Sequence, residues 1–348
     1  MDDQVVRLTT LSHGGGCGCK IAPGVLAELL GELPAGFRDP ALLIGTETGD
    51  DAAVYQINEH QAVVATTDFF MPIVDDPYDF GRIAASNALS DVYAVGAKPI
   101  LALALVGMPI DKLPLEVIRG ILAGGAAACA EAGVAIAGGH SIDAPEPIYG
   151  LAAVGLGDPA TIKRNIGARP GDLLILGKPL GVGILSAALQ KGALEALGYD
   201  EMIATTTRLN SIGADFAAWP GVHAMTDVTG FGLLGHLLEV CRGSNLGAVI
   251  EAQDLPLLPT ARALAESGTN TGAAGRNWAS YGHEVRLADE LPVWRKNLLC
   301  DPQTSGGLLI SVAADQAPAA LALFHDQGYQ GAAVVGHIVE GAARVTVV

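Results

Sequence analysis

The chain has 348 residues, which is long enough for two domains and a sizeable buried core. It carries 20 Lys and Arg against 37 Asp and Glu, a net charge of −17 that argues against non-specific nucleic-acid binding. Charged residues make up 16% and apolar residues 50%, so intrinsic disorder is excluded as the main state.

The apolar content raises the question of a membrane span, which the sequence does not support. The weakly charged stretch 121–142 is interrupted by five glycines and is better explained as a helix followed by a buried strand. The N-terminus lacks the basic and apolar segments of a secretory signal, so we expect a cytoplasmic protein. Five cysteines, a small and odd number, predict reduced thiols and no disulfide framework.

The first half of the chain mixes strands and helices. A glycine-rich segment at 12–20 is expected to be mobile, and a short helical pattern runs from Val25 to Leu30. Asp79 is expected to cap a helix that ends near Val95. Strands are predicted at 61–67, 100–106, 134–137 and 148–155, with helices at 79–95 and 115–132.

The second half repeats this mixture after a polar, basic stretch at 157–171, which marks the predicted domain boundary. Strands are predicted at 172–176, 222–226, 247–251, 307–312 and 332–338, and helices at 183–190, 201–219, 231–241 and 314–327. The interleaving predicts an α+β or α/β fold, with mixed sheets and flanking helices, and excludes all-α and all-β folds.

Several carboxylates lie at strand ends or turns and form the first chemical signal. Asn87 and Asp91 also share one face of a predicted helix, four residues apart. Taken singly, each carboxylate is more often a cap or turn residue; together, oxygen ligands from separate elements favour Mg²⁺. The carboxylates are Asp50, Asp51, Asp68, Asp91 and Asp227.

Nucleotide-binding glycine motifs are weak or missing. The segment 171–178 resembles a P-loop only by chance, because Pro179 stands where serine or threonine is required. The segment 230–235 fits G-x-G-x-x-G between a strand and a helix, but a lone match is weak. Asp227 beside it disfavours a direct phosphate cradle and favours a bridging metal ion.

The second signal is the pair Cys17 and Cys19 on the glycine-rich segment, followed by Lys20. A neighbouring cation favours the thiolate, so a catalytic thiol is one interpretation; incidental thiols and half of a soft-metal site remain the others. The histidines show no metal-binding spacing. His140, after two glycines, is consistent with a phosphate contact or with a simple tight turn.

Six segments together resemble one known family. The sequence is similar to the selenophosphate synthetase (selenide, water dikinase) family at residues 16–20, 49–53, 67–70, 138–143, 225–232 and 301–307. Acidic segments similar to those at 49–53 and 67–70 also occur in aminoimidazole ribonucleotide synthetase, thiamine-monophosphate kinase and a hydrogenase-maturation protein. The Gly-Cys-Gly-Cys-Lys loop singles out the selenium enzyme.

This resemblance implies a reaction and an architecture. The reaction converts ATP, selenide and water into selenophosphate, AMP and phosphate. The implied fold is a two-domain α+β fold like that of aminoimidazole ribonucleotide synthetase, and the implied assembly is a homodimer whose N-terminal halves share a sheet. The expected parts are a mobile catalytic loop at 1–20, an ATP-binding, Mg²⁺-binding and dimerisation domain at 21–157, and a C-terminal α+β domain at 170–348.

The resemblance also assigns roles to individual residues. Cys17 and Lys20 match catalytic positions, whereas Cys19 matches none. The implied magnesium ligands are Asp51, Asp91 and Asp227. The implied nucleotide-binding residues are Lys20, Thr48, Gly49, Asp50, Asp68 and Asp91, with Gly139, His140 and Ser141 supplied by the dimer partner.

Two other interpretations stay open. One is another ATP-dependent enzyme of the same superfamily that phosphorylates an amide or carboxylate of a small metabolite. The other is a non-enzymatic thiol carrier of metal or selenium. The expected partners are ATP, selenide and a second copy of the chain, with a selenium-delivery protein as a further candidate and with neither nucleic acid nor membrane.

Overall fold

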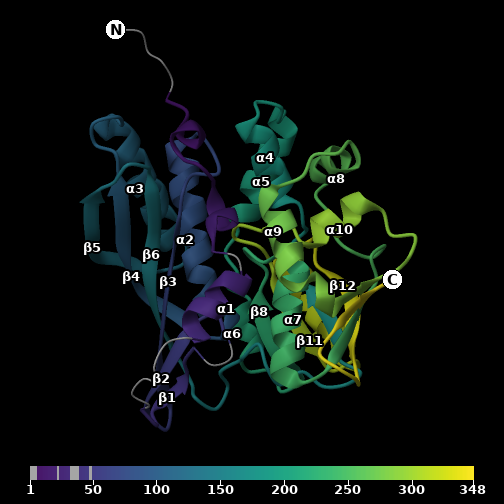
Figure 1. Ribbon diagram of the computed structural model, residues 1–348. Helices are drawn as coiled ribbons and strands as arrows, with labels where there is room; N and C mark the ends of the chain where they lie inside the picture. Colours follow the sequence, from purple (N-terminus) through teal and green to yellow (C-terminus); the bar gives the residue numbers. More distant parts are fainter. Residues whose placement is uncertain (1–5, 22, 32–38, 47–48) are drawn as a thin grey trace.

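The computed structural model describes residues 6–21, 23–31, 39–46 and 49–348, which form two mixed sheets with flanking helices (Figure 1). Helix α2 lies between them, in contact with β3 and β6 of the first sheet and β8 of the second. No helix in these ranges is both long and apolar enough to cross a membrane.

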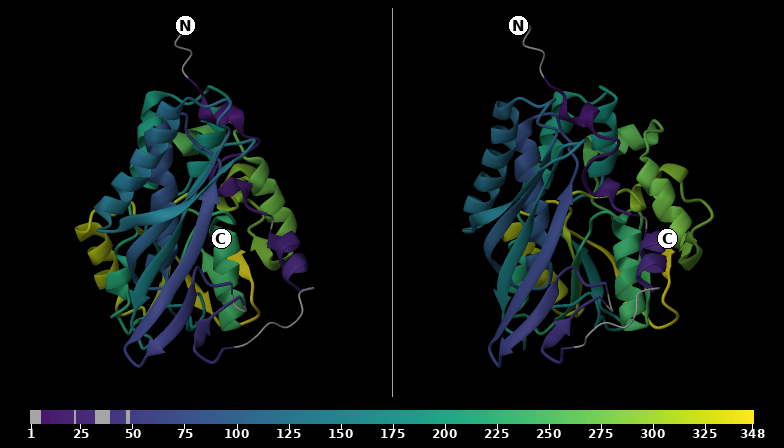
Figure 2. Two further views of the ribbon diagram at one scale, coloured as in Figure 1. Left: turned by 90° about the vertical axis from the view of Figure 1, so that its left-hand side faces the viewer. Right: turned by 60° about the vertical axis from the view of Figure 1, so that its left-hand side comes forward.

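The first sheet has the order β1-β2-β3-β6-β4-β5, in which only β4 and β5 pair in parallel. Helices α2 and α3 pack on one face; in the left-hand view of Figure 2 the strands lie in front of them. The elements are α1 (Pro23–Gly31), β1 (Leu42–Ile44), β2 (Ala53–Asn58), β3 (Gln61–Phe70), α2 (Pro77–Ala94), β4 (Lys98–Met108), α3 (Leu115–Glu131), β5 (Ala135–Asp143) and β6 (Ile148–Gly157), with short 3₁₀ helices at Leu8–Leu11 and Gly16–Cys19.

The second sheet has the order β10-β13-β9-β12-β7-β11-β8, so β8 lies at one edge. Its strands are β7 (Leu173–Leu176), β8 (Val222–Asp227), β9 (Gly247–Ile250), β10 (Val285–Leu287), β11 (Leu308–Val312), β12 (Ala333–Val339) and β13 (Val345–Val347). The helices are α4 (Val182–Gln190), α5 (Ala196–Thr206), α6 (Gly213–Phe216), α7 (Gly232–Ser244), α8 (Pro259–Glu266), α9 (Gly272–Tyr281), α10 (Val293–Leu299) and α11 (Ala317–Asp326), and Gly282–Glu284 is a 3₁₀ turn.

The predicted α+β class is confirmed, and each predicted strand has a counterpart, but some boundaries were wrong. The predicted helix 201–219 is two helices, separated by a segment in which the side-chain amide of Asn210 donates to Ser90 Oγ and to the carbonyl oxygen of Gly306. The cap of α2 is Asp76, whose carboxylate accepts from the Asp79 amide, instead of Asp79 itself. Asp68 lies within β3 and does not end it.

Strand β5 departs most from its prediction as a short buried strand followed by a turn. It continues to Asp143 in register with β4, and most of it is exposed at the sheet edge. Gly139 permits this pairing, because it has a φ of +155° and a β-carbon there would lie 2.1 Å from the Ala104 carbonyl oxygen. The segment 138–140 is therefore part of a strand, and the tight turn was wrong.

Candidate active site

Three carboxylates from different elements meet between the two sheets. Asp51 precedes β2, Asp91 lies in α2, and Asp227 ends β8. One ligand oxygen from each lies within 4.8 Å of the others. Hydroxyl groups position them: Thr66 Oγ1 donates to Asp91 over 2.6 Å, Thr226 Oγ1 donates to Asp51 over 3.0 Å, and Ser90 Oγ donates to Asp227.

This cluster fits a hard divalent cation. The atoms Asp51 Oδ2 and Asp227 Oδ1 are buried and have no hydrogen-bond partner in the described parts of the chain. Burial and mutual repulsion raise the pKa of Asp51 and of Asp91, and burial also raises the pKa of Asp227. Carboxylate oxygens that lack partners and repel one another are a donor set suited to Mg²⁺.

A chain of hydrogen bonds links Cys17 to Lys20 beside this cluster. The thiol of Cys17 donates to Asn87 Oδ1 at 3.2 Å, and Asn87 Nδ2 donates to Asp68 Oδ2 at 2.6 Å. The ammonium of Lys20 lies 3.2 Å from the same carboxylate oxygen. The backbone amide of Cys17 donates to Thr304 Oγ1 of the second domain, so both domains hold the thiol in place.

The pKa of Cys17 in this arrangement does not favour the thiolate that the neighbouring Lys20 led us to expect. Burial raises the pKa of the Cys17 thiol well above its usual range; Lys20 opposes this effect but does not outweigh it. Burial likewise raises the pKa of Cys19 to about 11. Desolvation lowers the pKa of Lys20, but the carboxylates, Asp68 first, raise it well above its usual value. In this arrangement the two shifts favour a protonated thiol beside an ammonium group.

Gly16 allows the loop to bring Cys17 into this position. Its φ is +54°, and a β-carbon there would lie 2.2 Å from Thr304 Oγ1 and 2.4 Å from Ile73 Cγ2. At Gly14 the nearest contact of such a carbon is an ordinary 3.6 Å to Cys19 Sγ. The mobility of the segment up to Lys20 stays a prediction.

We expect Gly16→Ala to prevent the loop from docking. The left-handed conformation alone costs about 1–2 kcal/mol for a residue with a β-carbon, and the clash adds to it. Turnover should fall about tenfold or more, and Cys17 should become more reactive toward iodoacetamide. Gly14→Ala is the control and should leave Cys17 as protected as in the unaltered chain; equal labelling of Cys17 in both variants would contradict the prediction.

The expected nucleotide-binding residues are not all brought together. Thr48 lies outside the described residues. Asp50 accepts from the Asn165 amide at 2.8 Å and from Arg164 at 3.2 Å, so it bonds to the segment between the domains. Gly49 also contacts this segment, since its carbonyl accepts from Asn165 Nδ2.

Gly139, His140 and Ser141 lie on β5, far from Asp68 on β3. The sheet order places β6 and β4 between these two strands, which is three inter-strand spacings or about 14 Å. Within one chain these three residues therefore do not join the carboxylate site.

Sequence reasoning missed several residues that the structure places in the site. Asn87, noted only as a neighbour of Asp91, connects Cys17 to Asp68, and Ser90 connects Asp227 to Asn210. Both lie on α2 and are fully buried. Polar residues spaced i, i+3 and i+4 in a buried helix otherwise rich in alanine would have been the signal.

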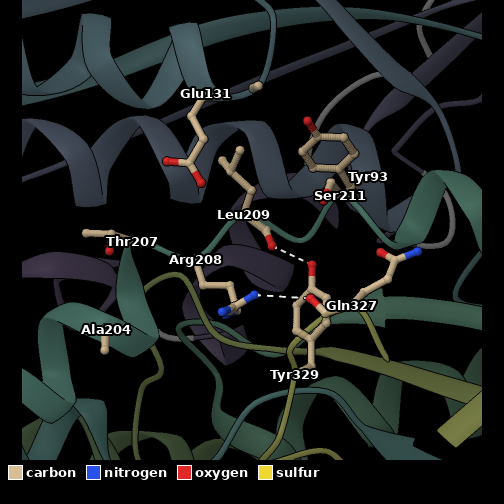
Figure 3. Close-up of a pocket in the computed structure, with 10 residues that line it drawn as sticks. Tyr93, Glu131, Ala204, Thr207, Arg208, Leu209, Ser211, Gln327 and Tyr329 are labelled. Atoms are coloured by element: carbon tan, nitrogen blue, oxygen red, sulfur yellow. Dashed lines mark hydrogen bonds between the residues drawn. The ribbon is translucent and has the colours of Figure 1, made fainter. Parts of the chain in front are cut away.

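A cavity of about 510 Å³ lies elsewhere between the domains (Figure 3). In it, the Arg208 guanidinium lies over the ring of Tyr329, whose hydroxyl donates to the Leu209 carbonyl oxygen at 2.6 Å. Tyr93 and Glu131 of α2 and α3 line its other side. It contains none of the predicted site residues, so its size does not make it the active site.

Comparisons with known proteins agree with this geometry. Residues 49–157 match the family described as AIR synthase related protein, N-terminal domain, and residues 169–348 match its C-terminal domain. The chain superposes on a HypE–HypF complex (TM-score 0.68, 18% identity, 93% of this chain and 95% of that one) and on thiamine-monophosphate kinase from Stenotrophomonas maltophilia K279a (TM-score 0.63, 22%, 89% and 92%). The fold is thus that of the AIR-synthase-related class.

Relatives of high sequence identity show which family within this class the chain belongs to. The chain is 64% identical to a selenide, water dikinase of Burkholderia pseudomallei (strain K96243) over 99% of its length and 98% of the relative's. It is 59% identical to a selenide, water dikinase of Dechloromonas aromatica (strain RCB) over the whole of both chains. The chain belongs to the selenide, water dikinase family.

Proposed function

We propose that this chain catalyses the conversion of ATP, selenide and water into selenophosphate, AMP and phosphate. The observation that carries the proposal is the hydrogen-bonded chain from Cys17 through Asn87 and Asp68 to Lys20, adjacent to the three clustered carboxylates. A thiol and a cluster of hard oxygen donors lie next to each other there, which supports phosphoryl transfer from a metal-bound nucleotide to selenium. Membership of the selenide, water dikinase family supports the same conclusion.

We infer that Asp51, Asp91 and Asp227 hold Mg²⁺ when Mg-ATP is bound, because their unpartnered oxygens are suited to it. The metal would neutralise phosphate charge. Lys20 stays protonated and is positioned by Asp68 to offset negative charge on the transferred phosphoryl group. Cys17, buried at the end of the hydrogen-bonded chain, would hold or deliver selenide.

Formation of AMP requires that both phosphoanhydride bonds break, so an ADP-level intermediate must be retained until water attacks. The Cys17 loop supports such retention, because it docks across both domains: Gly16 donates to the Met71 carbonyl oxygen at 2.8 Å, and Cys17 donates to Thr304. In the proposal this loop opens for substrates and closes for chemistry.

One experiment tests the proposal directly. Anaerobic turnover of ATP with Mg²⁺ is measured with and without selenide, with AMP resolved from ADP and phosphorus species followed by ³¹P NMR. AMP together with a selenium-bound phosphorus signal that needs selenide supports the proposal. ADP alone, formed regardless of selenide, would assign the chain to the metabolite-kinase side of the superfamily instead.

We also propose a homodimer formed through the first sheet. The face away from α2 exposes large apolar side chains, and β5 leaves its outer edge unpaired within the described chain. Apolar sheet faces and open edges of this kind are typical of interfaces. A partner could then supply Gly139, His140 and Ser141, which one chain holds away from its own site. The exposed side chains include Tyr55, Ile57, Phe69, Leu103, Ile142 and Leu156.

Charge placed on this face should dissociate the dimer. Leu103 is 40% and Phe69 52% exposed on adjacent parts of the sheet, so the double variant Phe69→Glu, Leu103→Glu should keep its fold and yield a monomer of 35.5 kDa. Light scattering after size exclusion measures the mass, and turnover should fall at least tenfold, on the order expected for loss of binding groups. The proposal would be contradicted if the unaltered chain were a monomer in solution and still fully active.

A further inference from the structure

A second cavity, of about 360 Å³, adjoins the Cys17 loop. One wall is formed by the backbone of Gly15 and Gly18 together with Ile73 and Thr304, and the other by residues of α4 and α9. Cys17 is only 1% exposed and lies behind this wall, with its amide bonded to Thr304. None of the four carboxylates Asp51, Asp68, Asp91 and Asp227 lines the cavity.

The charges in this cavity differ from those of the chain as a whole. Lys191 follows α4 and Arg276 lies in α9, and neither forms an ion pair with a carboxylate among the described residues. The guanidinium of Arg276 donates to the Gly18 carbonyl oxygen at 3.1 Å, which places its charge against the loop. His13, which also lines the cavity, bonds to Glu146, so the carboxylate of Glu146 already has a partner. Asp301 lies buried behind Thr271 and Gly183, but no carboxylate lines the cavity itself, so in a protein of net charge −17 its lining carries an excess of positive charge.

We propose that this cavity binds and admits the anionic selenium substrate, hydroselenide, to Cys17, with Lys191 and Arg276 as its recognition residues. The inference rests on the proposed function. Hydrogen selenide is a stronger acid than hydrogen sulfide and is a monoanion at neutral pH. On the nucleotide side the anion would meet the carboxylate cluster and the triphosphate, which repel it, whereas in the cavity it meets two cations.

The loop wall suits a small anion. Gly15 and Gly18 present only backbone to the cavity, so the loop itself adds no bulky side chain to a wall whose side chains come from Ile73 and Thr304. Because Arg276 bonds to Gly18, the same group that attracts the anion also touches the loop that must move to expose the thiol. Selenide and ATP would thus reach the reaction centre from different sides, and neither would block the other.

Steady-state kinetics test the proposal with the double variant Lys191→Gln, Arg276→Gln. We expect the KM for selenide to rise about tenfold, with the KM for ATP within about twofold of the unaltered value. The salt dependence of kcat/KM for selenide should also weaken in the variant. Arg119→Gln removes a positive charge from α3, where Arg119 pairs with Glu116 on the surface, and should change neither constant. An unchanged KM for selenide, or equal changes in both KM values, would overturn the proposal.

Alkylation of Cys17 provides a test that does not need turnover. In the Cys19→Ser background without ATP, rates are compared for anionic iodoacetate and neutral iodoacetamide. The double variant should lower the iodoacetate rate relative to iodoacetamide by about fivefold. If the rates with iodoacetate and with iodoacetamide rise by the same factor, Arg276 only holds the loop in place, and the proposal of anion recognition is overturned. If the unaltered enzyme fails to use selenide while this ratio still shifts, the proposed function fails and the anion site stands.

Discussion

Cys17→Ser is expected to lower selenide-dependent AMP formation by at least about 10³-fold, which corresponds to about 4 kcal/mol of lost transition-state stabilisation. A hydroxyl is a harder and far less acidic group than a thiol and does not hold selenium. It can still donate to Asn87 Oδ1, so the hydrogen-bonded chain to Asp68 and Lys20 should survive. The measurement is kcat for AMP at saturating selenide and Mg-ATP.

Two controls make the Cys17 result specific. Calorimetric binding of a non-hydrolysable ATP analogue with Mg²⁺ should change by less than about twofold, because the thiol lies outside the carboxylate cluster. Cys19→Ser should retain activity, since Cys19 donates no side-chain bond to the cluster residues in the described structure. Activity of Cys17→Ser above a tenth of the unaltered level would remove the thiol from the chemistry.

The sequence predicted the carboxylates better than the groups that position them. The position of acidic residues at strand ends, turns and one helix face indicated five candidate carboxylates, and the family resemblance selected Asp51, Asp91 and Asp227, which lie together in the structure. Thr66, Ser90 and Asn210 were not indicated, because hydroxyl and amide side chains are common in helices and loops. Their role depends on contacts between residues far apart in the sequence, 25 positions for Thr66 with Asp91 and more than a hundred for Ser90 and Asn210, which no local pattern reveals.

Errors in the fold prediction have a similar physical origin. The apolar run at 134–137 predicted a buried strand, but only Val134 is buried and Ile136 partly so, and the rest of β5 is an exposed edge. The hydrophobicity of a segment does not show whether a neighbouring strand or an exposed edge will result, and in the proposed homodimer the partner would cover this edge. The thiolate that Lys20 led us to expect at Cys17 is not favoured for a comparable reason. Burial raises the pKa of Cys17 more than the nearby cation lowers it, and burial is not visible in the local sequence.

Asp227→Asn is expected to abolish turnover and to stabilise the metal-free protein. Removal of one of three ligands should lower activity at millimolar Mg²⁺ by at least about 100-fold. The free energy of unfolding in EDTA at pH 8 should rise by about 1 kcal/mol or more, the equivalent of about one pKa unit, because a buried repulsion is relieved. Denaturant titration and AMP formation measure the two effects, with Asp111→Asn on the surface as the control.

The pH dependence of stability follows from the raised pKa values of Asp51, Asp91 and Asp227. Between the unfolded pKa of about 3.9 and the raised folded pKa, the folded state binds more protons than the unfolded state. The metal-free protein should therefore lose stability as pH rises through this window, and Mg²⁺ should restore more of it at pH 8 than at pH 5. Asp227→Asn should flatten the slope and shrink the Mg²⁺ effect. The same slope and the same Mg²⁺ stabilisation in both proteins would mean that the cation binds elsewhere.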